Sequence, residues 1–417
     1  MLARAEAERF TDDNPGAVVE WAVGTATSSV VPLGALRHLM GPADLDKSVS
    51  RTSVLRQARE LLRLRGRDRV LVVVDDAHYL DPLSATLLYQ LAATASARLV
   101  VTVGADRPVP EQVAALSRDG LLDRLDLESP QPARAAELRA RSEDELAALP
   151  DNIRTALDYL AVYQPLLLAD LATLTGDQLD PDAARNALRV IEADWGSFVY
   201  CAHPLVAEAA RGMLDDTSAR RLRTALVTRW SGRSPDSVID QLQLAVLALE
   251  SDRPRPVDEL VAAAGHALAL GDMVLAEKLA AAAPQPAGGL PARLILANAL
   301  AWQGRGREAD AILSAVDPAE LSETDLMAWA LPRAANQFFM LGDPAKATAF
   351  LQTTRDRITV PAARATLDAL AATFALNSGT PLRALRIADE VLASPHADQA
   401  ATGWAASAAA LSCARTG

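Results

Sequence analysis

A chain of 417 residues is too long for one hydrophobic core, and we expect it to divide into roughly two to four domains. Half of its residues are hydrophobic but only 4% are aromatic, and the frequent alanines favour close-packed helices over β-sandwiches. A net charge of −12 argues against a chain that grips nucleic acid through a broad electrostatic surface.

The number and spacing of particular residue types argue against several other classes of protein. Cys201 and Cys413 are too few and too far apart for a disulfide framework or a zinc site, and the five histidines are scattered without ligand spacing. No apolar run reaches the length of a membrane span, and the charged residues 1–10 differ from a signal peptide. We therefore expect a cytoplasmic protein that does not contact membranes.

The first part of the chain alternates helix-like and strand-like patterns. In chain order these predict a helix at Leu2–Phe10, a strand at Val18–Val23, helices at Leu36–Met40 and Val54–Leu64, a strand at Val70–Val74, a helix at Ser84–Ala95 and a strand at Leu99–Val103. Strands that alternate with helices indicate an α/β fold with a parallel sheet, and continuous aliphatic runs suit strands that are buried on both faces.

The strand at Val70–Val74 ends in two aspartates, Asp75 and Asp76. A buried strand with an acidic end is typical of the Walker B segment of P-loop NTPases, whose carboxylate holds Mg²⁺ on the nucleotide. That chemistry also needs an upstream glycine-rich loop to cradle the phosphates, and this loop is missing. Gly41–Ser48 comes nearest, but Asp46 replaces its second glycine and would repel a phosphate. We interpret that segment as a polar loop.

The two aspartates allow two interpretations. In the functional one, Asp75 is the Mg²⁺ ligand and Asp76 orients water; in the structural one, both are ends of a core strand that bond to the following loop. A carboxylate without phosphate-binding amides holds hydrated Mg²⁺ weakly. We therefore expect no cofactor, and Mg-ATP only if the missing P-loop is supplied. His78 is expected to be a polar loop residue.

The stretch from Val72 to Asp81, with Ser84–Leu88, resembles the Walker B region of large ATP-binding LuxR-type transcriptional regulators, which belong to the STAND class of signal-transduction ATPases. Further pieces follow in the family's order: Glu20–Thr25, Val31–Ala35, Leu121–Leu125, and Ala202–Leu205 with Glu208 and Arg211. The likeness covers about half of the chain. It implies a signal-responsive regulator with an ATPase core.

The resemblance also implies several losses. In the family the P-loop lies just before the segment that starts here at Met1, and Leu2–Phe10 would be the tail of the helix after it. Gly104 occupies the position of the family's sensor arginine, and Arg107 comes three residues later. The lid segment expected after Asp126–Leu127 is not found. We therefore expect a degenerate core that is truncated and has lost internal parts.

The middle of the chain suggests a winged-helix-like module. Its patterns predict helices at Leu146–Val162, Leu166–Leu174 and Pro181–Ala193, a strand at Ser197–Cys201 and a helix at Pro204–Met213. In the resembling family this module folds back on the nucleotide domain. His203 is accordingly a candidate phosphate contact, although a residue that caps the helix at Pro204 is the simpler interpretation. Acidic residues beside Arg185 and Arg189 argue against DNA binding.

The C-terminal half repeats a pattern of glycine, then alanine five residues later, then a bulky apolar residue eight residues after the glycine. The members are Gly271, Ala276 and Leu279; Gly304, Ala309 and Ile312; Gly342, Ala347 and Phe350; and Gly379, Ala384 and Ile387. A turn glycine between two helices, followed by a small residue where they cross, explains the pattern. The period resembles degenerate tetratricopeptide repeats (TPR), which offer a face to peptides or effectors.

These observations predict three segments: a degenerate STAND-type ATPase core at 1–130, a winged-helix-like module at 131–215 and a TPR-like helical array at 216–417. The family's C-terminal helix-turn-helix does not follow, so we expect no direct DNA binding. The predicted function is a LuxR-family STAND-type regulator homologue that senses signals and binds a protein, peptide or small effector. The alternatives are a non-enzymatic TPR-like scaffold and a surviving ATPase that uses Asp75.

Overall fold

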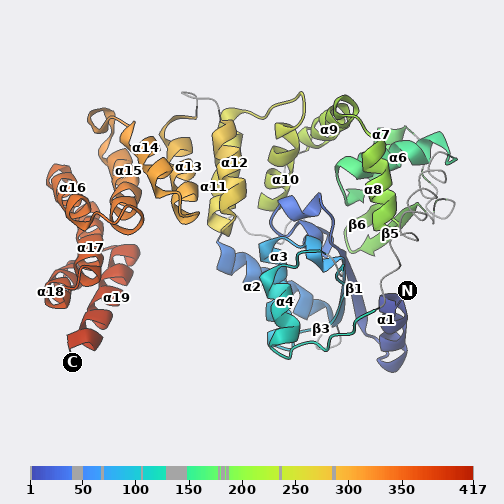
Figure 1. Cartoon of the computed structure of the whole chain (residues 1–417), viewed down its shortest axis with the longest axis horizontal. Coiled ribbons are helices and arrows are strands. Elements are labelled where there is room, and N and C mark those ends of the chain that lie inside the picture. The colour runs from blue at the N-terminus through green and yellow to red at the C-terminus, as the bar shows by residue number, and fades with distance from the viewer. Residues whose placement is uncertain are drawn as a thin grey trace. The chain divides into compact units, whose positions relative to one another are not determined.

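The computed structural model describes residues 2–39, 50–66, 70–104, 107–127, 148–176, 179, 184, 187–233, 237–283 and 288–416. The chain forms two compact units, Met1–Leu275 and Ala276–Gly417 (Figure 1). The first unit combines two small sheets with helices, and the second is built from helices in its described residues. The loop Gly41–Ser48, which nearly matches a phosphate-binding loop, lies outside the described residues.

A parallel sheet forms the N-terminal part of the first unit, as predicted. Its strands are β1 (Val18–Val23), β2 (Val70–Asp75) and β3 (Arg98–Val101), in the order β1-β2-β3. The five aliphatic residues of β2 are buried because this central strand is covered on both faces. In the register Val23 lies opposite Asp75, so the carboxyl ends of β1 and β2 lie side by side.

Helices and short 3₁₀ turns surround this sheet. They are α1 (Leu2–Asp13), η1 (Ser28–Val30), η2 (Gly34–Leu39), α2 (Arg51–Gly66), η3 (Ala77–Tyr79), α3 (Pro82–Ala93) and α4 (Glu111–Arg118). The helix α1 buries Ala7 and Phe10 in a cluster with Leu71 and Val73 of β2. The helix predicted at Leu36–Met40 is instead the 3₁₀ segment η2, which begins two residues earlier.

An antiparallel module follows. It consists of α6 (Asp151–Val162), β4 (Leu166–Leu167), α7 (Leu168–Thr175), β5 (Leu188–Ala193), β6 (Gly196–Cys201) and α8 (Pro204–Met213). The strand order is β4-β6-β5. The predicted helix at Leu146–Val162 is wrong over residues 148–150, which are not helical, because α6 begins at Asp151 after Pro150, whose restricted backbone suits the residue before a helix. Leu146 itself lies outside the described residues.

The predicted helix at Pro181–Ala193 is wrong over its last six residues, which form β5. These residues alternate between the two faces of the sheet and pair with β6 from Leu188 opposite Cys201 to Ala193 opposite Gly196. A two-residue turn joins the strands, and Gly196 has φ +154°, a value that side-chain-bearing residues rarely adopt. Hairpin pairing therefore overrides the helical pattern here. Arg185 lies outside the described residues.

The first unit continues with α9 (Asp216–Ser231), α10 (Val238–Leu249) and α11 (Val257–Leu270), and the division between the units falls within α12 (Met273–Ala282). Leu226 and Val227 of α9 and Leu244 and Leu247 of α10 join the buried core of the antiparallel module. The module is therefore packed against these helices as well as against the parallel sheet.

The second unit is a series of helical hairpins. Its elements are α13 (Gly289–Trp302), α14 (Gly306–Ser314), η4 (Pro318–Glu320), α15 (Glu323–Ala335), the π-helical continuation η5 (Asn336–Met340), α16 (Pro344–Arg357), α17 (Pro361–Asn377), α18 (Pro381–Leu392) and α19 (Gln399–Thr416). Helix α13 packs on α14, α15 on α16, and α17 on both α18 and α19.

The predicted glycine and alanine pattern is confirmed. The four glycines have positive φ, between +67° and +86°, and each follows the end of a helix: Gly271, Gly304, Gly342 and Gly379. The four alanines are fully buried: Ala276, Ala309, Ala347 and Ala384. Leu279 is also fully buried, whereas Ile312, Phe350 and Ile387 are partly buried beside the core.

Two further expectations concern boundaries and membranes. The chain divides into two compact units, whereas the sequence predicts three segments. The predicted boundary at 130/131 lies outside the described residues. The boundary at 215/216 stays a prediction; there Asp215 caps α9. Within the described ranges, no helix is both long and apolar enough to cross a bilayer.

Candidate functional site

The candidate site lies where β1 and β2 end. The amide of Gly24, directly after β1, donates to the Asp75 carbonyl at 2.8 Å. A Cβ on Gly24 would lie 2.3 Å from the carbonyl oxygen of Asp76, so only glycine allows the two loops to approach this closely. The geometry brings the two predicted site aspartates to the carboxyl edge of the sheet.

Asp75 is held on both of its oxygens. Its Oδ1 accepts a hydrogen bond from the Thr102 hydroxyl at 2.6 Å, and its Oδ2 lies 3.4 Å from the Arg189 guanidinium. Arg189 comes from β5 of the antiparallel module, and its guanidinium carbon lies 4.7 Å from the centre of the Trp21 ring. Asp75 is therefore one of the points at which the module contacts the end of the parallel sheet.

Asp76 has a left-handed backbone, with φ 54° and ψ 45°, which aspartate tolerates better than most residues. Its amide donates to the Thr102 hydroxyl at 2.9 Å, so one hydroxyl links both aspartates. Burial, together with the neighbouring charge of Asp75, raises the pKa of Asp76 to about 6. A second negative charge at this position is costly because the loop offers it little solvent.

His78 lies in the loop after the aspartates, as predicted. Its Nδ1 accepts from the Gly104 amide at 3.2 Å, and burial followed by the charge of Arg107 lowers the pKa of His78. Arg107 itself pairs with Glu208 of α8 at 3.1 Å. Gly104, where the sequence resemblance implies a sensor arginine, therefore supplies a backbone donor, and Arg107 joins the sheet domain to the module.

The next acidic residue, Asp81, is structural. It is buried at the start of α3, where one carboxylate oxygen accepts from the amides of Leu83 and Ser84 at 3.0 Å. The same oxygen accepts from the amide of Leu33 at 3.1 Å, and Leu33 has a positive φ of 59°. Asp81 thereby fixes the loop after β1 to the helix after β2.

Gln164 ties the module to the loop that follows β1. Its amide donates to the Thr27 hydroxyl at 3.1 Å, and that hydroxyl donates to the Gln164 carbonyl at 3.2 Å. The side-chain oxygen of Gln164 accepts from the Cys201 amide at 3.2 Å. The same residue therefore contacts both the sheet domain and β6.

His203 caps α8, in agreement with the simpler interpretation. Its Nδ1 accepts from the Leu205 amide at 3.2 Å, and Pro204 occupies the first helical position. The side chain also lines the cleft at the strand ends, beside Asp75 and Asp76. Its role as a phosphate contact stays a prediction.

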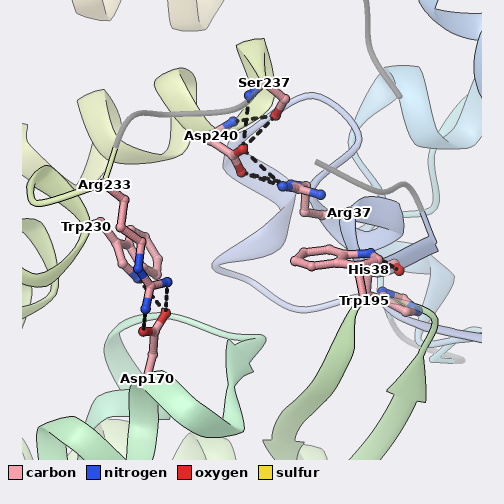
Figure 2. Close-up of polar contacts among 8 residues, drawn as sticks. All are labelled: Arg37, His38, Asp170, Trp195, Trp230, Arg233, Ser237 and Asp240. Atoms are coloured by element: carbon pink, nitrogen blue, oxygen red, sulfur yellow. Dashed lines mark hydrogen bonds and ion pairs between the residues drawn. The ribbon is translucent and has the colours of Figure 1, made fainter. Parts of the chain in front are cut away.

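Two neighbouring residues of η2, Arg37 and His38, make a second set of contacts between the layers of the unit (Figure 2). Arg37 is buried and pairs with Asp240 of α10 through both Nε, at 2.9 Å, and a terminal nitrogen, at 2.7 Å. Its guanidinium carbon lies 4.6 Å from the Trp195 ring centre. Asp240 also accepts from the hydroxyl and the amide of Ser237, which completes the cap of α10.

His38 is fully buried between β1 and the β5–β6 hairpin. Its Nε2 hydrogen-bonds the carbonyl oxygen of Trp21, and its Nδ1 lies 3.2 Å from the Tyr200 hydroxyl. The Trp195 indole donates to the His38 carbonyl at 3.0 Å. The Arg189 guanidinium lies over the Trp21 ring. A continuous series of side-chain and backbone contacts therefore connects Asp240 of α10 with Asp75.

The cleft at the strand ends offers little space. Its cavity of about 50 Å³ has room for only a few waters, since each needs roughly 10–15 Å³, whereas a ligand-sized pocket spans several hundred cubic ångströms. The lining comes from both the sheet domain and the module: Val23, Gly24, Thr25, Ala26, Asp75, Asp76, Tyr79, Gln164, Arg189, Cys201, Ala202, His203, Pro204, Ala207, Glu208 and Arg211.

Mg-ATP, the group that the resemblance implies, does not fit these residues. Asp75 already has a hydrogen bond on one oxygen and a cation beside the other, and the cleft is too small for a nucleotide. Within the described ranges no group of three or more acidic, histidine or cysteine side chains is arranged to hold a metal ion. No catalytic step can be derived for this arrangement.

The sequence pointed to Asp75 and Asp76 but missed their partners. Thr102 follows β3, and Arg189 was assigned to a helix although it lies on a strand. The adjacent β-branched residues Val190 and Ile191 were the available signal, because such residues are enriched in strands. No sequence signal pointed to the pair Arg37–Asp240.

No family model matches the chain, and no curated protein matches it in sequence. Among solved structures the chain is similar to a Signal Transduction ATPase with Numerous Domains (STAND) protein with a tetratricopeptide repeat sensor from Pyrococcus horikoshii. The identity is 11% and the TM-score 0.35, over 98% of this chain and 80% of that one. A similarity at this level carries neither fold nor function over to this chain.

Proposed function

We propose that this chain is a STAND-type signalling protein that binds a protein or peptide through its helical hairpins and does not turn over nucleotide. The repeated hairpin of the second unit carries the proposal. A positive-φ glycine and a fully buried alanine recur in each hairpin, and such arrays bury a continuous core while they present an extended surface. The alternative of a TPR-like scaffold shares this surface and differs only in lacking a regulated first unit.

The surface of the second unit supports partner binding. Large apolar side chains are exposed near the hairpin turns: Trp302 is 75% exposed, and Phe339 and Met340 are 47% and 46% exposed. Met340 lines a cavity of about 360 Å³ together with Arg307 and other residues of the turn. Exposed aromatic side chains and arginines are among the residue types that contribute most to protein interfaces.

The finer parts of the proposal come from the sequence resemblance. We take α6, α7, β4 and the β5–β6 hairpin as a winged-helix-like module that acts within the molecule, because Arg189 and Gln164 direct it toward the parallel sheet. The LuxR-type assignment implies control of transcription through other parts or partners. A net charge of −12 disfavours direct DNA binding by this chain.

Peptide selection tests partner binding. Peptides are selected from a random library on the full-length chain and then measured against single variants by fluorescence polarisation. Trp302→Ala and Arg307→Ala should weaken the selected peptides at least about tenfold, as expected for central interface residues. The matched control is Trp404→Ala, a 41% exposed tryptophan elsewhere in the same unit. Equal losses in all three variants, or none, would overturn the proposed surface.

Calorimetry tests the claim about nucleotide. Titration of the full-length chain with Mg-ATP should give no saturable heat below the millimolar range, because backbone amides and a lysine at the phosphates supply most of the affinity in such sites. Asp75→Ala should leave this result unchanged. A micromolar dissociation constant that weakens in Asp75→Ala would instead establish the surviving ATPase, the second alternative.

A further inference from the structure

We propose that the start of α14 binds an acidic side chain of a partner peptide, whose carboxylate takes the place of a helix cap that this hairpin lacks. The inference rests on the proposed function and deepens it, because it names the chemistry of the peptide and the turn that it contacts. The site is the cavity of about 360 Å³ lined by Gly304, Arg305, Gly306, Arg307, Glu308, Met340 and Leu341.

Two other hairpins carry such a cap within the chain. In each of them an aspartate directly follows the turn glycine, and its carboxylate accepts from an amide in the first turn of the next helix. Asp272 accepts from the Leu275 amide at 3.0 Å, and Asp343 accepts from the Lys346 amide at 3.0 Å. The free amides and the partial positive charge of a helix start favour a carboxylate at this place.

The hairpin at α14 has Arg305 where the other two have aspartate. No side chain caps α14, and the first amides that donate to the Arg305 carbonyl are those of Glu308 and Ala309. In the described part of the chain, the amides of Gly306 and Arg307 are therefore left without an acceptor. A carboxylate from another molecule would complete the start of the helix.

The ion pairs around the cavity leave one guanidinium for such a carboxylate. Arg305 donates to Glu277 at 2.7 Å and to Glu308 at 2.6 Å, so both of these glutamates are already bonded. Arg307 is exposed, lines the cavity and makes no ion pair with another described residue. Its guanidinium and the two amides at the helix start together provide the charge and the donors that bind a carboxylate most strongly.

A buried acceptor at the cavity wall indicates what lies beside the carboxylate. Asn336 is 2% exposed, and its Nδ2 donates to the Gly306 carbonyl at 2.9 Å. Its Oδ1 has no hydrogen-bond partner among the described residues and would lie 3.1 Å from a Cβ on Gly306, which lines the cavity. Buried acceptors are nearly always paired, so this oxygen requires a donor. A peptide offers backbone N–H groups next to its acidic side chain.

Apolar side chains beside the cavity favour a peptide over a small anion. Met340 lines the cavity, and both Met340 and the adjacent Phe339 are exposed. They belong to η5, a π-helical segment of the kind that often occurs at functional sites. Methionine adapts to irregular apolar partners. We therefore expect the bound peptide to carry an apolar residue close to its acidic one.

A double-mutant cycle between peptide and protein tests the contact. Peptides selected on the full-length chain are synthesised with amidated C-termini, so that their carboxylates belong to aspartate or glutamate side chains. Replacing the acidic residue by its amide should weaken binding to the wild type at least about tenfold in fluorescence polarisation. On Arg307→Gln the same replacement should cost about threefold or less, because the paired cation is gone. Equal losses on both proteins, or selected peptides without an acidic residue, overturn the proposal.

The matched control is Arg383→Gln. Arg383 is an exposed arginine in the first turn of α18, which follows another of the repeated turn glycines. Loss of the peptide carboxylate should still weaken binding at least about tenfold on this variant. If Arg383→Gln reduced that effect as much as Arg307→Gln does, the peptide would respond to overall charge, and the assigned contact would be wrong.

A cap supplied by the chain itself gives a second measurement. Arg305→Asn provides a capping side chain after the turn glycine, whereas Arg305→Ala removes the same guanidinium without a cap. Arg305→Asn should bind the selected peptides at least about fivefold more weakly than Arg305→Ala, and equal binding would overturn the role of the helix start. A chain that binds no peptide contradicts the proposed function as well. Peptides that depend on Trp302 but not on Arg307 contradict this inference alone, so the two failures are distinguishable.

Discussion

The two units are stabilised in different ways. The second unit repeats one local device, a turn glycine followed by a buried alanine at a helix crossing, and its core forms between helices that are close in sequence. The first unit is joined by polar contacts between distant segments: Arg37 and Asp240 are 203 residues apart, and Arg189 and Asp75 are 114 apart. The second unit therefore depends on close packing between neighbouring helices, whereas the first unit combines its hydrophobic clusters with charge pairs between distant segments.

This difference predicts which substitutions each unit tolerates. In the first unit, the substitutions that should lower the free energy of unfolding most are those that remove one partner of a buried charge pair. Leaving a buried charge unpaired costs far more free energy than losing an ion pair at the surface. In the second unit the sensitive changes alter volume at a crossing, because a packed interior has no room for added methylene groups. The predictions below test this contrast, from the largest expected effect to the smallest.

Loss of the Asp170 carboxylate should destabilise the first unit most. Asp170 is 1% exposed and accepts from Arg229 at 3.0 Å. It also accepts from the Trp230 indole at 3.2 Å and from Arg233 at 2.5 Å (Figure 2). Asp170→Ala removes the buried carboxylate that these three side chains share. We expect a loss of about 2–4 kcal/mol in the free energy of unfolding, measured by urea denaturation.

The matched control lies in the second unit. Asp368 of α17 pairs with Arg355 of α16 at 2.5 Å, but its side chain is 27% exposed, whereas that of Asp170 is 2% exposed. Asp368→Ala should cost about 0.5–1 kcal/mol, as partly exposed pairs do. An equal loss in the two variants would contradict the claim that buried charges hold the first unit.

Overpacking at a helix crossing tests the second unit. Ala347 is fully buried in the core that also contains Ala309 and Trp329, so Ala347→Leu should destabilise by about 1–3 kcal/mol. The control is Ala349→Leu, two residues along the same helix at an exposed position, which should change stability by about 0.5 kcal/mol or less. Similar losses of stability in the two variants would contradict the interpretation of Ala347 as a small residue at a helix crossing.

Much of the fold could be predicted from the sequence because its signals are local. The aliphatic strand Val70–Val74 and the glycine–alanine spacing each depend on neighbouring residues alone, and both are confirmed. The segment at Leu188–Ala193 failed because pairing with β6, set by the turn at Gly196, decided its conformation. Tertiary pairing overrides local preference in short segments.

The site was predictable only in part. An acidic end on a buried strand identified Asp75 and Asp76, since the carboxyl edge of a parallel sheet is where such residues gather. Their partners Thr102 and Arg189 lie 27 and 114 residues away from Asp75, and no spacing rule connects them. Only the folded arrangement shows that the carboxylate is already paired.

The raised pKa of Asp76 predicts a pH-dependent effect of Asp76→Asn, which suits the left-handed backbone. Because the pKa of Asp76 is about 6 in the folded chain and 3.8 ordinarily, ionisation favours the unfolded state as pH rises from about 4 to 6. Asp76→Asn removes this penalty. It should be more stable than the wild type by about 1–2 kcal/mol at pH 7.5 and by much less at pH 4. Urea unfolding at both pH values checks this, and a difference that does not change with pH would refute it.

The smallest expected changes in stability concern two glycines, at which substitution by alanine should have opposite effects. Gly304 has φ +80°, and a Cβ built there would meet no atom within 4 Å, so Gly304→Ala adds backbone strain alone and should cost about 1 kcal/mol. Gly403 lies inside α19 with equally open space around it, and Gly403→Ala should stabilise by about 0.5–1 kcal/mol because alanine favours the helix. Thermal unfolding of both variants measures the pair. A gain at both positions would mean that Gly304 is not needed at the turn, and the hairpin pattern would then rest on the buried alanines alone.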